Sequence, residues 1–123
     1  MTHQLKKRIQ IVLAVSTLLL TNNALASEIS VANGKKLFYL ERLHSKGESV
    51  SCTLCHTTDA RQPGKTRANK VIEPLAPVAN PKRFTDEAKV EKWFTRNCKD
   101  VLERLCTAEE KQSFILYMKS IQK

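Results

Sequence analysis

The segment Ser51-Cys-Thr-Leu-Cys-His56 restricts this chain more than any other feature of its sequence, because it brings two thiols and an imidazole together. The spacing Cys-x-x-Cys-His is typical of a c-type haem attachment site. In such a site both cysteines bond the porphyrin, and the histidine binds the iron from one side. We therefore predict one covalently attached haem c, bonded to Cys52 and Cys55, with His56 as an iron ligand.

Other chemistries of the cysteines fit this pattern less well. The chain has four cysteines: Cys52, Cys55, Cys98 and Cys106. Two disulfides, in any of three connectivities, are an open alternative for an exported chain. Thioredoxin-like chemistry requires a βαβ pattern that this sequence lacks, and a zinc site requires four ligands, for which only His56 and His44 are at hand beside the cysteines. The histidine directly after the second cysteine favours haem.

The N-terminus has the pattern of an export signal. Lys6-Lys7-Arg8 precedes a mostly apolar run from Ile9 to Leu20, and Ala24-Leu25-Ala26 is typical of a cleavage site. The run is shorter than the roughly 20 residues of a membrane-spanning helix, although an uncleaved anchor is an alternative. We predict a signal peptide at residues 1–26 and a periplasmic haem domain at 27–123, with no membrane span in the mature chain.

The charge of the exported part limits its partners. Residues 27–123 keep 18 of the 21 Lys and Arg and all 12 Asp and Glu, a formal charge of +6. Such a surface is either simply solvated or a patch that steers an acidic redox partner, and both interpretations stay open. Nucleic acid is not an expected partner, because the basic residues at 61–70 lack interleaved aromatic side chains.

Hydrophobic periodicity predicts helices and no convincing strand. A first helix is expected over residues 31–44, with Gly34 as a point of close approach to another element. Residues 57–84 are rich in proline and polar side chains, so we expect a long loop. A loop of this length is uncommon unless a cofactor gives it a surface on which to pack.

Two further helices are expected after this loop. The second begins with Thr85 as its N-cap, and the third begins with a capping box formed by Thr107 and Glu110. The inward stripe of the second helix is Val90, Trp93, Phe94 and Asn97, and that of the third is Phe114, Ile115, Met118 and Ile121. The predicted fold class is all-α, with terminal helices around a loop-rich middle that binds haem.

The attachment motif leaves the second face of the iron without a ligand. Met1 and His3 are removed with the signal peptide, so Met118 and His44 are the remaining methionine and histidine outside the motif. Met118 lies on the apolar stripe of the last helix and is more simply a core residue. His44 follows the first helix closely before the motif, where a solvated or capping histidine is the simpler interpretation.

Asn97 is the remaining candidate, and its position is unusual. Asparagine is poorly suited to the interior of a helix because its amide competes for backbone hydrogen bonds, yet Asn97 follows Trp93 and Phe94 on the inward stripe. A helix C-cap or a left-handed turn residue is the alternative interpretation. Asn80 is a rival in the loop, but it precedes Pro81 and fits a turn.

Three segments resemble the class I cytochromes c. They are Gly34-Lys-Lys-Leu-Phe38, Cys52-Thr-Leu-Cys-His56 and Phe114-Ile-Leu-Tyr-Met118, and they extend over nearly all of the mature chain. In that class, an N-terminal helix before the motif packs against a C-terminal helix. Most members also place a methionine ligand in the loop between, which this chain lacks.

The sequence of residues 74–100, "PLAPVANPKRFTDEAKVEKWFTRNCKD", is similar to one small family within that class, the sphaeroides haem proteins. The resemblance implies a high-spin haem with Asn97 as the second iron ligand, which leaves when oxygen or nitric oxide binds the reduced haem. It also implies a disulfide between Cys98 and Cys106. We place Trp93 and Phe94 in the haem pocket.

Three functions follow as alternatives. We favour a haem protein that exchanges electrons with a redox partner protein, a larger or multi-haem cytochrome, and that binds small diatomic ligands at the iron. A simple electron carrier would require a strong sixth ligand and a low-spin haem. An enzyme that turns over oxygen, nitric oxide or peroxide would require a distal acid–base group, for which the sequence offers no assured candidate, so whether the chain is an enzyme stays open.

Overall fold

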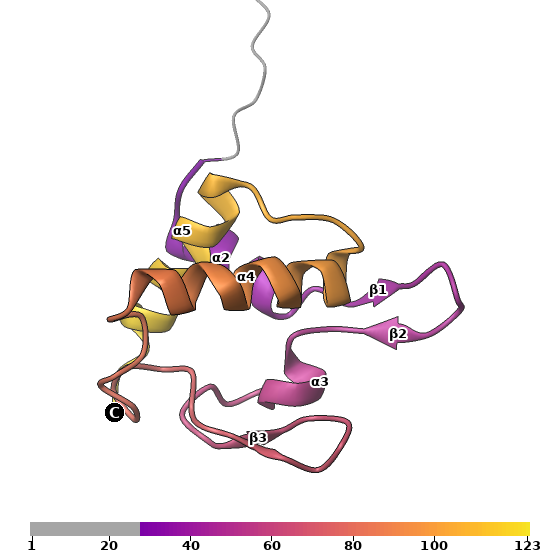
Figure 1. The fold of residues 1–123 in the computed structure, drawn as a ribbon. Coiled ribbons are helices and arrows are strands. Elements are labelled where there is room, and N and C mark those ends of the chain that lie inside the picture. Colours follow the sequence, from indigo (N-terminus) through magenta and orange to yellow (C-terminus); the bar gives the residue numbers. More distant parts are fainter. Residues whose placement is uncertain (1–27) are drawn as a thin grey trace, which may run out of the picture.

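The computed structural model describes residues 28–123, and the predicted signal peptide, residues 1–26, lies outside the described part. Helix α2 (Val31–Phe38) opens the described chain. The Ser30 hydroxyl caps this helix by accepting a hydrogen bond from the Asn33 backbone N–H at 3.1 Å. Figure 1 shows α2 beside α5 (Ala108–Ser120), the last helix of the chain.

The first helix is six residues shorter than residues 31–44, and this prediction was wrong beyond Phe38. Strand β1 (Arg42–Leu43) pairs with β2 (Ser49–Val50) as an antiparallel hairpin. Gly47 in its turn has a φ of 83°, a left-handed conformation that glycine adopts without strain. The hairpin therefore replaces the expected last turn of the helix.

Helices α2 and α5 approach each other closely at Gly34, as predicted. A Cβ at this position would overlap the Ser113 carbonyl oxygen and lie 2.8 Å from the Tyr117 Cβ. The Ser113 hydroxyl is buried, and it accepts a hydrogen bond from the Ser30 backbone N–H at 3.1 Å. The absence of a side chain on Gly34 thus sets the distance between the two helices.

The middle of the chain surrounds a short helix, α3 (Thr53–His56). After it, β3 (Gly64–Lys65) pairs with β4 (Val71–Ile72) in a second two-residue ladder. The sequence did not reveal these two short hairpins, since two residues are too few to show an alternating pattern. The all-α class is nevertheless confirmed, because helices form the whole framework.

Helix α4 (Glu87–Leu102) begins one residue later than expected. Its N-cap is Asp86, whose carboxylate accepts a hydrogen bond from the Lys89 backbone N–H at 3.0 Å, whereas the Thr85 hydroxyl donates to the Lys82 carbonyl. The capping box of α5 is present as predicted, with Thr107 and Glu110 each capping the other's backbone N–H.

One hydrophobic cluster joins the helices to the loop of the middle segment. Phe38 and Met118 are completely buried in it, and the Phe38 ring meets the Phe114 ring edge-on at 6.1 Å. Leu75 and Ala76, from the loop after β4, belong to the same cluster. In Figure 1, α4 lies above α3 and β3.

Candidate haem site

The Cys-x-x-Cys-His segment forms one short helical turn. The His56 backbone N–H donates to the Cys52 carbonyl at 3.0 Å, so His56 lies one helical turn after the first cysteine. Cys52 and Cys55 are both free thiols and half-buried, and Cys52 packs against the main core cluster. The alternative of two disulfides was wrong, because this pair is not bridged.

The protonation of these groups is set by burial. Burial raises the pKa of Cys52 to about 11, with a smaller contribution from neighbouring Cys55. Burial also lowers the pKa of His56 to about 4, assisted by the positive charge of Arg83, and this keeps the imidazole neutral, as an iron ligand must be.

Two contacts hold the turn in place. Gly64 of β3 presses on it so closely that a Cβ there would overlap the Cys55 carbonyl oxygen and lie 2.9 Å from the His56 Cα. The Tyr39 hydroxyl, from the end of α2, donates to the Thr58 carbonyl at 2.8 Å. The segment after the motif is therefore fixed to both the β3 hairpin and the first helix.

These residues fit a c-type haem. Two unbridged thiols and a neutral imidazole lie on one helical turn beside apolar residues, which is the donor set that thioether attachment and axial ligation require. Cys98 and Cys106 are bonded to each other, so a four-cysteine zinc site is excluded.

Asn97 lies on α4, half-buried, in the turn after Phe94. The helix continues to Leu102, and its C-cap is Glu103 in the left-handed conformation with a φ of 55°. The interpretation of Asn97 as a C-cap or left-handed turn residue was therefore wrong. Asn97 is therefore an interior position of α4, away from both helix ends. At such a position asparagine caps no free backbone group, so capping does not explain why it is there.

The rival candidates have other partners. The His44 Nε2 lies 3.1 Å from the Val101 carbonyl oxygen, at the C-terminal end of α4. Met118 is completely buried in the core. The Asn80 amide oxygen accepts from the Lys82 backbone N–H at 3.3 Å, as a turn residue does. Each of these side chains thus has a structural explanation that Asn97 lacks.

The two aromatic residues predicted to line the pocket differ in their surroundings. Phe94 is half-buried, and its ring meets the Phe114 ring edge-on at 5.6 Å. Trp93 is 44% exposed, and the Arg96 guanidinium lies 5.8 Å from its ring centroid. Phe94 therefore belongs to the interior, whereas the role of Trp93 in a haem pocket stays a prediction.

The predicted disulfide between Cys98 and Cys106 is confirmed, with 5.6 Å between the Cα atoms. Eight residues along one unbroken helix would span about 12 Å, well beyond the roughly 7 Å limit of a bridge. The left-handed Glu103 ends α4 between the two cysteines and makes the bridge possible. The bridge closes the connector directly after Asn97.

Sequence reasoning missed two residues of this site. Gly64 was read only as a loop signal, although its lack of a side chain lets β3 touch the attachment turn. Arg83 was not singled out, although it is half-buried and its charge acts on His56. The available signal was its place between Pro81 and Phe84.

Comparison with known proteins places this site in a family. Residues 24–118 match the family described as a domain of unknown function (DUF1924). The chain is 46% identical over 85 residues to the cytochrome c-type protein SHP of Cereibacter sphaeroides, and 41% identical over 90 residues to cytochrome c'' of Methylophilus methylotrophus. These matches cover 69% and 72% of this chain, and 66% and 62% of the two relatives' own lengths.

Solved structures of these two relatives also match this chain. The structure of oxidised cytochrome c'' matches with a TM-score of 0.71 and 34% identity, over 96% of this chain and 91% of that one. Oxidised SHP, described as an oxygen-binding cytochrome c, matches with a TM-score of 0.68 and 44% identity, over 72% of this chain and 80% of that one.

The chain belongs to the family described as a domain of unknown function (DUF1924). Its resemblance to the sphaeroides haem proteins is thereby confirmed, and so is the small all-α cytochrome fold. The cytochrome c-type relatives imply haem c as the cofactor. No helix within residues 28–123 is both long and apolar enough to cross a membrane.

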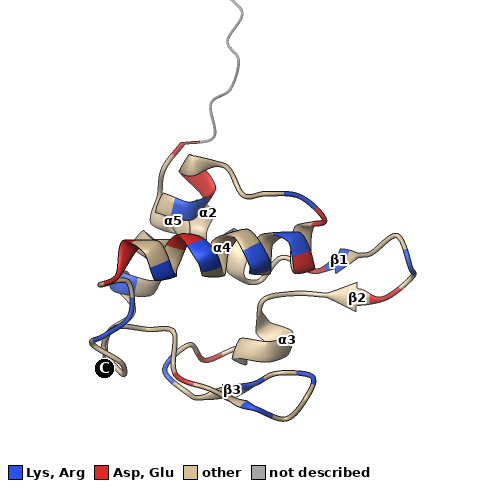
Figure 2. Ribbon diagram, in the orientation of Figure 1, with Lys and Arg blue, Asp and Glu red and all other residues tan. Residues whose placement is uncertain are grey.

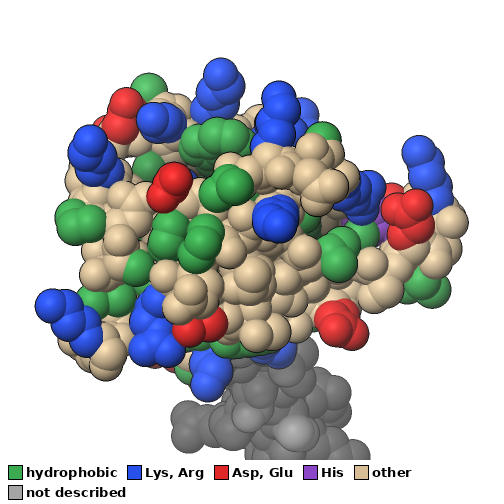
Figure 3. Space-filling view, turned by 90° about the horizontal axis from the view of Figure 1, so that it is seen from below, with side chains coloured by type: hydrophobic (Ala, Val, Ile, Leu, Met, Phe, Trp, Pro, Cys, Tyr) green, Lys and Arg blue, Asp and Glu red, His purple; other side chains and the backbone are tan. Residues whose placement is uncertain are grey.

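The surface of this chain carries both basic and acidic side chains. Figure 2 shows basic residues on α4, α5 and the hairpin of β3, with acidic residues interspersed along α4. The space-filling view shows the same distribution on the face seen from below (Figure 3). The charge is thus spread over several elements on this face.

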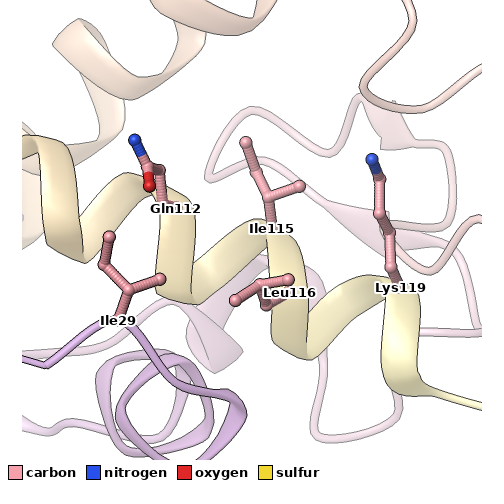
Figure 4. A pocket seen from close by; sticks show the side chains of 5 residues that line it. All are labelled: Ile29, Gln112, Ile115, Leu116 and Lys119. Carbon is pink, nitrogen blue, oxygen red and sulfur yellow. The ribbon is translucent and has the colours of Figure 1, made fainter.

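A hollow of about 220 Å³ lies on α5, apart from the attachment helix. Figure 4 shows its lining side chains, which come from α5 and from the segment before α2: Ile29, Gln112, Ile115, Leu116 and Lys119. None of these can attach a haem or bind its iron as the residues of the motif can. The hollow therefore contributes nothing to the candidate haem site.

Proposed function

We propose that this chain is a periplasmic mono-haem c-type cytochrome that exchanges electrons with a redox partner protein and binds a small diatomic ligand at the iron. Residues 1–26 are the cleaved signal peptide, and residues 27–123 are the haem domain. Haem, when bound, supplies a redox-active iron with two axial positions. The partner is a larger or multi-haem cytochrome, and the diatomic ligand is oxygen or nitric oxide.

The residues of the site divide the work. Cys52 and Cys55 hold the haem by thioether bonds, and the neutral imidazole of His56 takes one axial position. The amide oxygen of Asn97 takes the other. An amide oxygen is a weak neutral donor, so it leaves the haem high-spin and gives way to an incoming ligand. His56 and the two thioether bonds would hold the haem independently of Asn97.

The position of Asn97 carries this proposal. It lies in the interior of α4 on the side that bears Phe94, five residues before the helix ends, while His44, Asn80 and Met118 have other partners. SHP is described as an oxygen-binding cytochrome c, and a solution structure of cytochrome c'' is described in terms of haem-ligand detachment. A displaceable ligand is consistent with both relatives.

Two other functions are less well supported. A simple electron carrier requires a strong second ligand, and the one methionine of the described chain is completely buried in the core. An enzyme acting on oxygen, nitric oxide or peroxide requires a distal acid–base group. His44 would be the first candidate, but it contacts the Val101 carbonyl.

Substitution of Asn97 tests the proposal. Asn97→Ala should keep the haem attached and the protein folded, because attachment depends on the cysteines of the motif. Nitric oxide should bind the reduced protein about tenfold faster or more, since no side chain has to leave first. Stopped-flow absorption measures the rate. Asn80→Ala is the matched control, an asparagine in a loop turn, and it should bind at the wild-type rate.

Two results would contradict the proposal. A mass of the exported protein equal to that of bare polypeptide would exclude covalent haem attachment. Unchanged spectra and unchanged binding rates in Asn97→Ala would exclude Asn97 as the ligand. In the second case, His44 would be the next residue to replace.

A further inference from the structure

Arg83 differs from every other arginine of the described chain because it is not exposed. Its Nε donates to the Pro74 carbonyl at 2.7 Å, and one terminal nitrogen donates to the Glu73 carbonyl. Both partners are neutral backbone groups. Four of the exposed arginines instead form ion pairs with carboxylates: Arg61, Arg67, Arg96 and Arg104.

A half-buried cation without an anionic partner is costly, because partial desolvation is not balanced by a nearby opposite charge. Burial lowers the pKa of Arg83, and the carboxylate of Glu73 only partly opposes this effect. Lys111 shows the usual arrangement, since it is the one lysine of residues 28–123 that is not exposed, and it pairs with Glu91 at 2.6 Å. Within residues 28–123 no carboxylate forms an ion pair with Arg83, so its guanidinium is available for another anion.

The position of Arg83 points to the haem. The loop that holds it is bound to the attachment segment, since the Leu75 and Ala76 backbone N–H groups both donate to the Ala60 carbonyl at 2.9 Å. Ala60 follows His56 by four residues. Two backbone hydrogen bonds therefore fix the loop of Arg83 to the segment that directly follows the proposed iron ligand.

We propose that Arg83 binds a propionate carboxylate of the haem. This inference rests on the haem attachment proposed above. A guanidinium has five N–H donors, and the two carbonyl bonds leave three of them free and fix the plane in which they point. A planar fork of this kind matches a carboxylate, which a lysine at the same place would not. The propionate would be the anionic partner of Arg83, whose two hydrogen-bond acceptors in the protein are neutral carbonyl groups.

The reduction potential of the holoprotein tests this role. A cation paired with the propionate offsets a negative charge near the iron, and that negative charge would favour the oxidised state. Arg83→Gln should therefore shift the equilibrium about tenfold toward oxidised protein, which is a midpoint potential about 59 mV lower for one electron. Arg83→Lys should recover most of this shift, because the charge returns. Arg61→Gln, an exposed arginine paired with Asp59, should not change the potential.

Infrared spectroscopy tests the contact itself. Redox-difference spectra of protein carrying haem with ¹³C-labelled propionates would assign the carboxylate bands. These bands should shift in Arg83→Gln, and they should also shift in Arg83→Lys, which lacks the fork. A lower potential with unshifted bands in both variants would overturn the proposal, because a nearby charge without contact would suffice.

An unchanged potential in Arg83→Gln would also overturn it. If Arg83→Gln fails to fold, the infrared bands of Arg83→Lys decide, since that variant keeps the charge. Mass spectrometry of the wild type separates this inference from the proposed function. A wild type without covalent haem refutes the cytochrome itself, whereas a haem-bearing wild type with an indifferent Arg83 refutes only the propionate contact.

Discussion

The two pairs of cysteines in this chain have different fates. Cys52 and Cys55 lie three residues apart on one helical turn and remain free thiols. Cys98 and Cys106 lie eight residues apart, on either side of a helix end, and form a disulfide. All four belong to the predicted exported part, where an oxidising environment would act on each of them. Redox conditions alone therefore do not explain the difference.

Local backbone geometry separates the pairs. The first pair is held on a turn fixed by Gly64 and Tyr39, next to the histidine that a haem requires. The second pair meets because Glu103 ends α4 in a left-handed conformation and brings the Cα atoms to 5.6 Å. The first pair stays available for the proposed haem, and the second closes the connector behind the candidate iron ligand.

The β1–β2 hairpin joins the two regions. It leads directly into the attachment motif through the buried Val50, and its own turn contacts the end of α4. There the Ser45 hydroxyl donates to the Glu103 carboxylate at 2.6 Å, beside the contact of His44 with Val101. This hairpin therefore connects the attachment segment to the C-terminal end of α4.

The largest expected effect comes from removing the first pair. Cys52→Ala combined with Cys55→Ala should abolish covalent haem attachment, because no thiol of the motif remains. Mass spectrometry of the exported, denatured protein should show the bare polypeptide. The matched control is Cys98→Ser combined with Cys106→Ser, which should retain one haem. A haem adduct in the first variant would show that the two pairs are not distinct in function.

Gly64→Ala should damage the first region next most severely. The added methyl group would overlap the backbone of Cys55, and an overpacked site of this kind costs about 3 kcal/mol of the free energy of unfolding. Urea denaturation and the yield of haem-bearing protein measure both consequences. Lys65→Ala, the exposed neighbour on the same strand, should cost less than about 0.5 kcal/mol. Equal stability of the two variants would contradict the close contact.

Removal of the disulfide should have a similar but slightly smaller effect. Cys98→Ser combined with Cys106→Ser opens a loop whose ends are eight residues apart in the sequence. Loop entropy predicts that this lowers the free energy of unfolding by about 2.5 kcal/mol. The helix end behind Asn97 would become less constrained, so nitric oxide binding should also become faster. Urea denaturation and stopped-flow absorption measure these changes. Wild-type values for both would show that the bridge does not support the ligand helix.

Loss of the hairpin contact should be smaller still. His44→Ala removes the hydrogen bond to the Val101 carbonyl, which contributes about 1 kcal/mol. If the hairpin couples the two regions, the urea midpoint should fall and the spectrum of the haem should change slightly. Leu43→Ala is the control, because Leu43 is 73% exposed on the same hairpin. The same effect in both variants would show that the contact of His44 has no special role.

The helices could be predicted from the sequence because their signals are local. The capping box at Thr107 and Glu110 lies within one helical turn and was correct. The apolar stripe of α5 was correct only in part, because Ile115 is half-buried and Ile121 lies after the helix end. The end of α2 could not be predicted, because it depends on the pairing of residues 42–43 with 49–50. The same holds for the β3 hairpin, whose strands are too short to show a period of two.

The same distinction between local signals and long-range contacts applies to the candidate site. The Cys-x-x-Cys-His motif is contiguous, so the sequence alone indicated the residues of the attachment side. The disulfide followed from family resemblance, since spacing permits three pairings of four cysteines. Arg83 was missed because its importance arises from burial and from the carbonyls of Glu73 and Pro74, neither of which a sequence displays.

The smallest expected effect concerns the capping carboxylate that follows the disulfide. Glu110 accepts from the Arg104 guanidinium and from the Thr107 backbone N–H, and these hydrogen bonds, that of Arg104 first, lower its pKa. A carboxyl whose pKa is lower in the folded state stabilises the fold at neutral pH. This stabilisation is lost as the pH falls through the range between the unfolded and folded pKa values.

Glu110→Gln keeps a side-chain acceptor for the capping box but removes the charge. The variant should therefore be about 0.5–1 kcal/mol less stable than the wild type at pH 7, the usual value of a partly exposed ion pair. At a pH below both pKa values the carboxyl is protonated in both states, so the two proteins should be nearly equal in stability. Urea denaturation at the two pH values measures the difference. A gap of the same size at both would show that Glu110 acts through its shape alone, and that the charge contributes nothing to the start of α5 behind the bridge.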